Sequence, residues 1–184
     1  MLSATLKSGL LVALLSTMSI TASPVLAGGL VSEIRGGVLA HDVPDLWSGF
    51  RRETTSPDVN LELLLSPSAL FFGGTLRPAI GASINTGGDT SHVYADARWQ
   101  YDLPAGLFVS LGLGGAIHDG NLGPEDPDRK ALGSRLLFHM PLEVGYHFDE
   151  HNLVSVYFEH TSNAYTQDFN EGLDRLGIRY GYHF

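Results

Sequence analysis

From Leu30 onward, hydrophobic and polar residues alternate along the chain with a period of two. Side chains two positions apart share one face of a β-strand, so the alternation predicts strands with one apolar and one polar face. Clusters of Gly, Pro, Asn and Asp separate the alternating segments, as turns do. Eight strands are predicted, at residues 30–41, 58–66, 75–86, 90–102, 106–118, 131–148, 151–163 and 173–184.

The polar face of these strands carries charges of both signs. It is formed by Glu33, Arg35, Glu62, Arg77, Asp96, Arg98, Gln100, Arg135, His139, Glu143 and Arg179. A soluble sandwich would bury its apolar faces and leave strand edges to protect. The mixed charges instead favour an all-β protein, an eight-stranded antiparallel transmembrane β-barrel of the outer membrane with a polar interior and a lipid-facing wall. A soluble lipocalin-like barrel, with its apolar residues around a cavity, is the alternative.

The connections between the predicted strands differ in length. Residues 42–57, 119–130 and 164–172 form long connections, whereas 103–105 and 149–150 are short. Outer-membrane barrels have long outer loops and short periplasmic turns, so the alternation predicts a periplasmic N-terminus, with Gly87 and Gly88 in a short outer exception. The alternating C-terminal segment that ends in Phe184 resembles the assembly signal of outer-membrane proteins.

The first 27 residues differ from the rest of the chain. Lys7 precedes an apolar stretch at 10–20, and small residues surround Ala27, a pattern that predicts a cleaved signal peptide over 1–27 and a barrel domain over 28–184. The 184-residue chain has no cysteine, which excludes disulfides and cysteine-containing zinc sites. Its formal net charge of −9 argues against nucleic acid as a partner.

The segment 158–164, Phe-Glu-His-Thr-Ser-Asn-Ala, carries the candidate chemistry. His160 and Ser162 share one face of the predicted strand, as a general base and a hydroxyl nucleophile would. Val154, Val156 and Phe158 lie on the same face. The pattern therefore predicts a hydrolytic site on a surface that meets lipid.

Asp174 is the predicted third member of this site. Strand parity places it on the outward face, where a carboxylate needs a partner. A hairpin that closes near Ser162 and Gly172 would set His160 directly opposite Asp174. We therefore expect Ser162 as nucleophile, His160 as base and Asp174 as acid. Asn163 is expected to donate a hydrogen bond to the oxyanion, and Glu171 is the alternative acid.

The segments 159–164 and 170–174, with the closing strand to Phe184, resemble the lipid A 3-O-deacylase family (PagL-type, acyloxyacyl hydrolases). The resemblance implies an outer-membrane esterase that removes the acyl chain at position 3 of lipid A and needs no metal or cofactor. It implies His160 as base, Ser162 as nucleophile and Asn163 as oxyanion-hole donor, with lipopolysaccharide as substrate and outer-membrane lipid around the barrel. The family usually has Glu where this chain has Asp174.

Other functions stay open at this level. A non-enzymatic small barrel for adhesion, binding or membrane stabilisation is one, and a barrel phospholipase or acyltransferase is another. Whether the barrel forms a homodimer is also open. Four acidic residues in one loop could bind divalent ions or merely be solvated: Asp119, Glu125, Asp126 and Asp128. Four basic residues lie where lipid phosphates would sit: Arg51, Arg52, Arg129 and Lys130.

Overall fold

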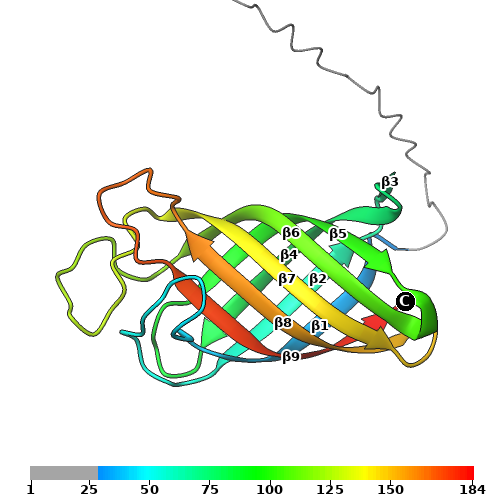
Figure 1. Cartoon of the computed structure of the whole chain (residues 1–184), viewed down its shortest axis with the longest axis horizontal. Helices are drawn as coiled ribbons and strands as arrows, with labels where there is room; N and C mark the ends of the chain where they lie inside the picture. The colour runs from blue at the N-terminus through cyan, green and yellow to red at the C-terminus, as the bar shows by residue number, and fades with distance from the viewer. Residues whose placement is uncertain (1–28) are drawn as a thin grey trace, which may run out of the picture.

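The computed structural model describes residues 29–184, so the predicted signal peptide over 1–27 lies outside the described residues. The described chain forms an antiparallel barrel (Figure 1). Its strands are β1 (Val31–Ala40), β2 (Asp58–Leu65), β3 (Ala69–Phe71), β4 (Gly74–Asn85), β5 (His92–Asp102), β6 (Leu107–His118), β7 (Leu136–His147), β8 (Asn152–Ser162) and β9 (Leu173–His183), with a short 3₁₀ turn η1 (Pro104–Gly106) between β5 and β6.

Closure of the barrel follows from the strand pairing. β1 pairs with both β2 and β9, and β2 pairs with β4, so eight strands of the described chain form a ring. The predicted eight-stranded antiparallel barrel is confirmed. The short strand β3 was not predicted, because the Ser, Pro and Gly residues at 66–74 indicate a connection. It pairs antiparallel with the first residues of β4 and forms a short hairpin with them.

The segment 131–135 differs from its prediction. The sequence indicated a strand from residue 131, but β7 begins at Leu136. Gly133, with a φ of +74°, turns the chain before the strand starts. Arg135, expected to point inward, is exposed and donates hydrogen bonds to the carbonyl oxygens of His118 and Gly120. Residues 131–135 therefore belong to a loop.

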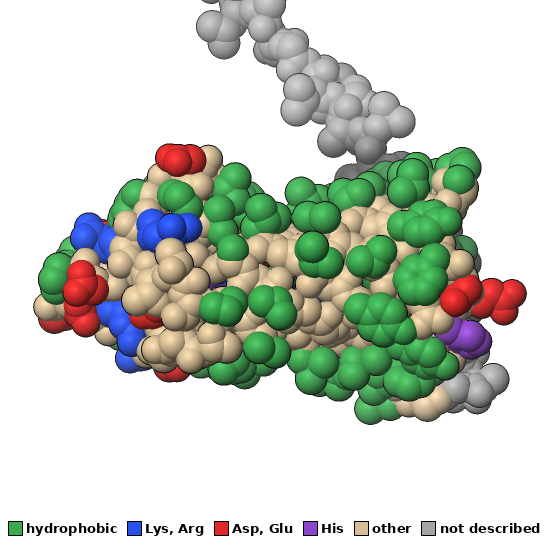
Figure 2. Space-filling view, turned by 90° about the horizontal axis from the view of Figure 1, so that it is seen from below, with side chains coloured by type: hydrophobic (Ala, Val, Ile, Leu, Met, Phe, Trp, Pro, Cys, Tyr) green, Lys and Arg blue, Asp and Glu red, His purple; other side chains and the backbone are tan. Residues whose placement is uncertain are grey.

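The outer wall of the barrel is apolar. Hydrophobic side chains cover it, while the charged side chains gather mainly at the end formed by the long loops (Figure 2). Val59, Leu113, Val156 and Ile178 all expose more than half of their surface on this wall. Such a belt matches the hydrocarbon region of a bilayer. Among residues 29–184, no helix is long and apolar enough to cross a membrane.

The interior of the barrel is filled by ion pairs. Glu143 lies at their centre, with its carboxylate 2.5 Å from Arg35, 2.8 Å from Arg98 and 2.6 Å from Arg179. All four side chains are buried. Charges removed from water are tolerated when they are paired and hydrogen-bonded in this way. The prediction that the polar strand faces meet inside a closed barrel is therefore correct for these residues.

The long connections gather at one end of the barrel, and the C-terminus lies at the other (Figure 1). The loop end carries residues 41–57, 86–91, 119–135 and 163–172. This arrangement agrees with the alternation of loop lengths in the sequence. It also brings the C-terminal end of β8 and the N-terminal end of β9 beneath the long loops, where the candidate chemistry lies.

Candidate active site

His160 and Asp174 form a close pair at the loop end of the barrel. They are register partners on β8 and β9, as the hairpin expected from the sequence requires. The Nδ1 atom of His160 lies 2.6 Å from Oδ1 of Asp174. Their neighbours Glu159 and Arg175 are buried among the interior ion pairs, so the pair itself belongs to the outward face. With Nδ1 held by the carboxylate, Nε2 is the nitrogen left to exchange a proton.

A loop covers this pair, whereas the sequence predicted a surface open to lipid. His160 is 4% exposed and Asp174 is fully buried, although Val156 on the same face is 56% exposed. The indole of Trp47 stacks on the imidazole of His160, and the backbone N–H of Ser48 donates to Oδ2 of Asp174 at 2.6 Å. Both residues come from loop 41–57, which has no periodic pattern from which this contact could be predicted.

Ser162 is the last residue of β8. It lies two residues after His160 and therefore on the same outward face of the strand. It is 6% exposed, and its register partner on β7 is Phe138. In the described part of the chain, no hydrogen bond joins the Ser162 hydroxyl to His160. Catalytic hydrogen bonds are often long in substrate-free enzymes and shorten when the substrate binds. The structure thus brings a hydroxyl, an imidazole and a carboxylate to one end of two neighbouring strands.

Gly172 shapes the space beside the imidazole. Its φ of +67° is one that glycine adopts without strain. A Cβ atom at this position would lie 3.1 Å from Cε1 of His160. A larger residue would therefore strain the backbone and press on the ring, so glycine leaves the imidazole its position next to Asp174.

The side chain of Asn163 is engaged within the loops. Its Nδ2 atom donates to the carbonyl oxygens of Leu132 and Phe169 at 2.8 and 2.6 Å. Its backbone N–H donates to Oδ1 of Asn170. Both amide hydrogens of the side chain therefore have acceptors, and Asn163 joins loop 163–172 to loop 119–135. Its role as an oxyanion donor stays a prediction, which requires the amide to turn away from these carbonyls.

Glu171, the alternative acid, has other partners. One carboxylate oxygen accepts a hydrogen bond from the backbone N–H of Ala131 at 2.7 Å, and the other lies 3.0 Å from the Arg52 guanidinium. These contacts join three outer loops and use both oxygens. Of the two acids weighed from the sequence, Asp174 is the one in contact with the imidazole.

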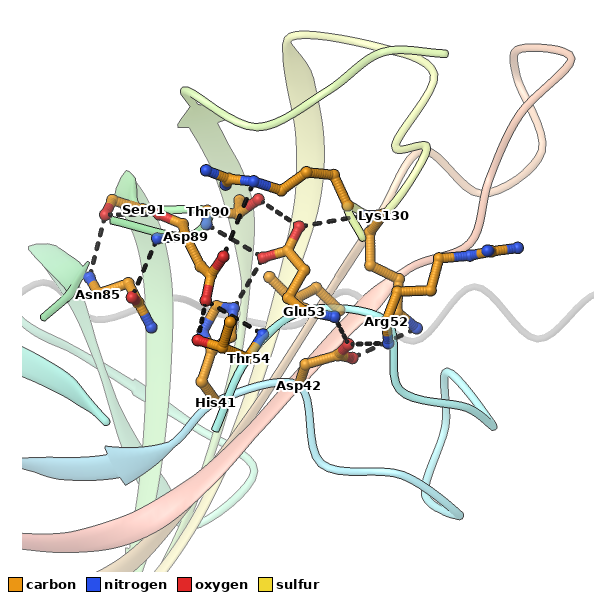
Figure 3. Close-up of polar contacts among 12 residues, drawn as sticks. His41, Asp42, Arg52, Glu53, Thr54, Asn85, Asp89, Thr90, Ser91 and Lys130 are labelled. Carbon is orange, nitrogen blue, oxygen red and sulfur yellow. Dashed lines mark hydrogen bonds and ion pairs between the residues drawn. The ribbon is translucent and has the colours of Figure 1, made fainter. Parts of the chain in front are cut away.

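A buried polar network holds loop 41–57 against the neighbouring loops (Figure 3). Both ring nitrogens of His41 face carboxylates, Nδ1 at 2.9 Å from Asp58 and Nε2 at 2.8 Å from Glu53. Burial opposes a charged ring, but these two hydrogen bonds outweigh it and raise the pKa of His41. Burial likewise opposes the charge on Glu53, yet hydrogen bonds from His41 and Thr90 lower the pKa of Glu53 to about 2. Glu53 is therefore charged near neutral pH, and its carboxylate favours the charged form of the His41 ring.

The basic loop residues are less available to bind lipid phosphates than the sequence indicated. Lys130 is fully buried, with Nζ 3.3 Å from Asp42 and donating to the carbonyl oxygen of Phe50. Arg51 donates to the backbone of Asp42, and Arg52 pairs with Glu171. Lys130 thus stabilises loop 41–57 through these contacts. This geometry does not support its predicted contact with lipid phosphate.

A second cluster of titratable residues, His92, His139 and Glu159, lies inside the barrel and was not predicted. Glu159 is 3.3 Å from Nε2 of His92 and 3.1 Å from Nε2 of His139. Asp96 holds the other nitrogen of His139, and Arg175 contacts Nδ1 of His92 at 2.8 Å. Because an arginine always donates, Nδ1 of His92 accepts and Nε2 carries the hydrogen. The cluster is arranged as an ion-pair network, which suits a metal ion poorly.

The profile of the family described as lipid A 3-O-deacylase (PagL) matches residues 45–183 of this chain. The matched region includes Trp47, His160, Ser162 and Asp174. The chain belongs to the lipid A 3-O-deacylase (PagL) family. PagL proteins are hydrolases of the outer membrane that act on lipid A, and the barrel described above is an outer-membrane barrel.

A solved structure supports the same fold. The crystal structure of the outer membrane enzyme PagL superposes with a TM-score of 0.63 at 20% sequence identity, over 83% of this chain and 100% of that one. The crystal structure of Neisserial surface protein A (NspA) gives a TM-score of 0.48 at 9% identity, over 83% of this chain and 96% of that one. A search of curated protein sequences returned no match.

Proposed function

We propose that this protein is an outer-membrane serine esterase that hydrolyses the 3-O-linked acyl chain of lipid A. The contact between Nδ1 of His160 and Oδ1 of Asp174 carries the proposal, because it orients an imidazole on the outward face of the barrel beside the hydroxyl of Ser162. Membership of the PagL family supplies the substrate class. The site lies at the loop end, which is the outer-leaflet end of the barrel in the predicted orientation.

In the proposed reaction, Ser162 Oγ attacks the ester carbonyl carbon while its proton passes to Nε2 of His160. Asp174 keeps the imidazole in the tautomer that can accept this proton and stabilises the charged ring. Collapse of the tetrahedral intermediate breaks the bond to the sugar oxygen, which takes the proton from His160. Water then attacks the acyl-enzyme with His160 again as base, releasing a fatty acid and regenerating Ser162.

The decisive experiment compares lipid A from cells that carry the wild-type protein, the Ser162→Ala variant or the His160→Ala variant. Mass spectrometry should show the loss of one acyl chain with wild type only. Triad members act as a unit, so each variant should lose activity by a factor on the order of 10⁴ or more. Both must still shift in apparent mass on heating in detergent gels, which reports a folded barrel.

Two results would count against the proposal. Near-normal deacylation by folded Ser162→Ala would require another nucleophile. Release of fatty acid from phospholipid, with lipid A left intact, would identify a phospholipase in place of a lipid A esterase.

A further inference from the structure

Loop 41–57 reaches over the barrel wall at the His160–Asp174 pair. The rings of Trp47 and His160 are stacked, with centroids 4.5 Å apart and an angle of 13° between their planes. The backbone N–H of Val43 also donates to the carbonyl oxygen of Asp174 at 3.0 Å. The loop therefore contacts both the base and the acid of the proposed site, from the side opposite to the barrel interior.

These contacts limit the orientations that the side chains of His160 and Asp174 can adopt. The hydrogen bond to Asp174 restrains one edge of the imidazole, and the stacked indole restrains its plane. The carboxylate is restrained as well, because one oxygen binds His160 and the other accepts the N–H of Ser48. A hydrogen bond to an ionised carboxylate is stronger than one between neutral groups. Together the two loop residues set the orientation of the pair.

The loop is itself held in place, so it can act as a rigid support. Asp45 and Gly49 both have positive φ angles and are joined by a backbone hydrogen bond of 3.2 Å, which closes a tight turn around Trp47 and Ser48. On either side of this turn lies the buried network of His41, Asp42 and Glu53 (Figure 3). The turn is therefore anchored at both of its ends.

We propose that Trp47 and the backbone N–H of Ser48 are positioning groups for His160 and Asp174, so that loop 41–57 completes the active site from outside the barrel wall. This inference rests on the proposed function, because it assigns a task to the loop within that site. Trp47 keeps 62% of its surface exposed and could instead serve only to bind an acyl chain. Positioning and acyl binding change different kinetic quantities, which allows them to be separated.

The test is the rate at which a small alkyl fluorophosphonate labels Ser162 in the folded, detergent-solubilised protein. The probe carries no lipid A, so its rate reports how well the serine is activated. Trp47→Ala should lower the rate by about 10²-fold, since small displacements of catalytic groups have effects of that size. Trp47→Phe should recover much of the rate because it keeps a stacked ring. Leu46→Ala, a neighbouring exposed apolar residue of the same turn, should label as wild type.

Ser48 provides a second and independent pair of variants. Ser48→Pro removes the backbone N–H that binds Asp174, whereas Ser48→Ala keeps it. We expect Ser48→Pro to lose labelling and kcat with little change in KM, and Ser48→Ala, which keeps the N–H, to label much faster than Ser48→Pro. This pair decides the question if Trp47→Ala fails to give the heat-modifiable, folded form.

The outcomes distinguish this inference from the proposed function. Wild-type labelling at Ser162 with equally fast labelling of Trp47→Ala, or of Ser48→Pro, would overturn the positioning role. A change confined to KM in Trp47→Ala would assign Trp47 to acyl binding instead. A folded wild-type protein that the probe does not label at all would contradict the proposed function itself.

Discussion

Phe138 on β7 is the register partner of Ser162 on β8. Directly opposed side chains of an antiparallel pair have Cβ atoms about 4.5–5.5 Å apart. Phe138 lies on the outward wall and is 46% exposed, so its ring forms the apolar surface next to the proposed nucleophile. A fatty acyl chain whose ester carbonyl reaches Ser162 would therefore pass this ring.

Phe138→Ala should raise KM for lipid A about tenfold while changing kcat much less. The ring contributes apolar contact to substrate and transition state alike, and a tenfold effect corresponds to about 1.4 kcal/mol, part of the value of burying one aromatic side chain. Steady-state deacylation in mixed micelles measures both constants. Phe148→Ala removes a similarly exposed ring at the opposite end of the barrel and serves as the control. Equal kinetics of the two variants would remove Phe138 from the binding surface.

The identity of the acid is tested by three substitutions. Asp174→Asn should lower kcat by a factor on the order of 10⁴, because it removes the charge that stabilises the imidazolium. Glu171→Gln should be mild, since Glu171 contacts Arg52 and Ala131. Asp174→Glu should stay active at a reduced rate, because the family residue restores the charge but its extra methylene must fit beneath Ser48. Deacylation that survives Asp174→Asn and disappears with Glu171→Gln would reverse the assignment.

The His41 network predicts a pH dependence for the seating of loop 41–57. The pKa of His41 is raised in the folded protein, so the stability from its charged ring is fully present below the unfolded value of about 6.5. That stability is lost as the pH rises through the raised folded value. Glu53, whose pKa is lowered to about 2, keeps its charge over this range, while Arg175 nearby opposes the charge on His41.

Hydrogen exchange of residues 41–57 should therefore quicken as the pH rises above about 6.5. His41→Gln should remove this pH dependence and leave exchange fast throughout. Because amide exchange is itself base-catalysed, the rates are compared with those of the turn at 149–150. A wild-type loop whose protection, after this correction, is constant from pH 6 to pH 9 would contradict the role of His41.

Glu143 is predicted to be the most sensitive charged position for stability. Glu143→Ala leaves Arg35, Arg98 and Arg179 without their shared carboxylate inside the barrel. Removing one partner from a buried ion pair costs about 3–5 kcal/mol. Urea unfolding in detergent, followed by the gel shift of the barrel, measures the change. Glu150→Gln, at an exposed turn position, should leave the unfolding midpoint where it is in wild type.

Much of the barrel could be predicted from alternation, because a strand residue's face follows from its parity. A hairpin that closes near Ser162 and Gly172 also places His160 opposite Asp174, as the structure shows. Trp47 escaped prediction for a physical reason. Its contact with His160 joins an irregular loop to a strand far along the chain, and the loop conformation depends on positive φ angles at Asp45 and Gly49. The sequence predicted a site on a lipid-exposed surface, whereas His160 and Asp174 are buried. This burial depends on loop 41–57.

Asn163 shows a second limit of the sequence pattern. The motif identifies the residue after Ser162, and parity alone cannot tell where its amide points once the strand has ended. The amide joins Leu132 to Phe169 across two loops. The segment 131–135, predicted as strand, forms one of those loops, so a wrong strand boundary concealed a partner of Asn163.

The ion pairs around Glu143 also bear on what the protein does to the membrane that holds it. Arg35, Arg98, Arg179 and the ring of Tyr157 occupy the middle of the barrel with essentially no solvent-accessible surface. A lumen occupied in this way gives hydrated ions and small solutes no continuous aqueous path. Planar-bilayer recordings should accordingly show no steady conductance, and cells could display many copies of the protein without weakening the permeability barrier of the outer membrane.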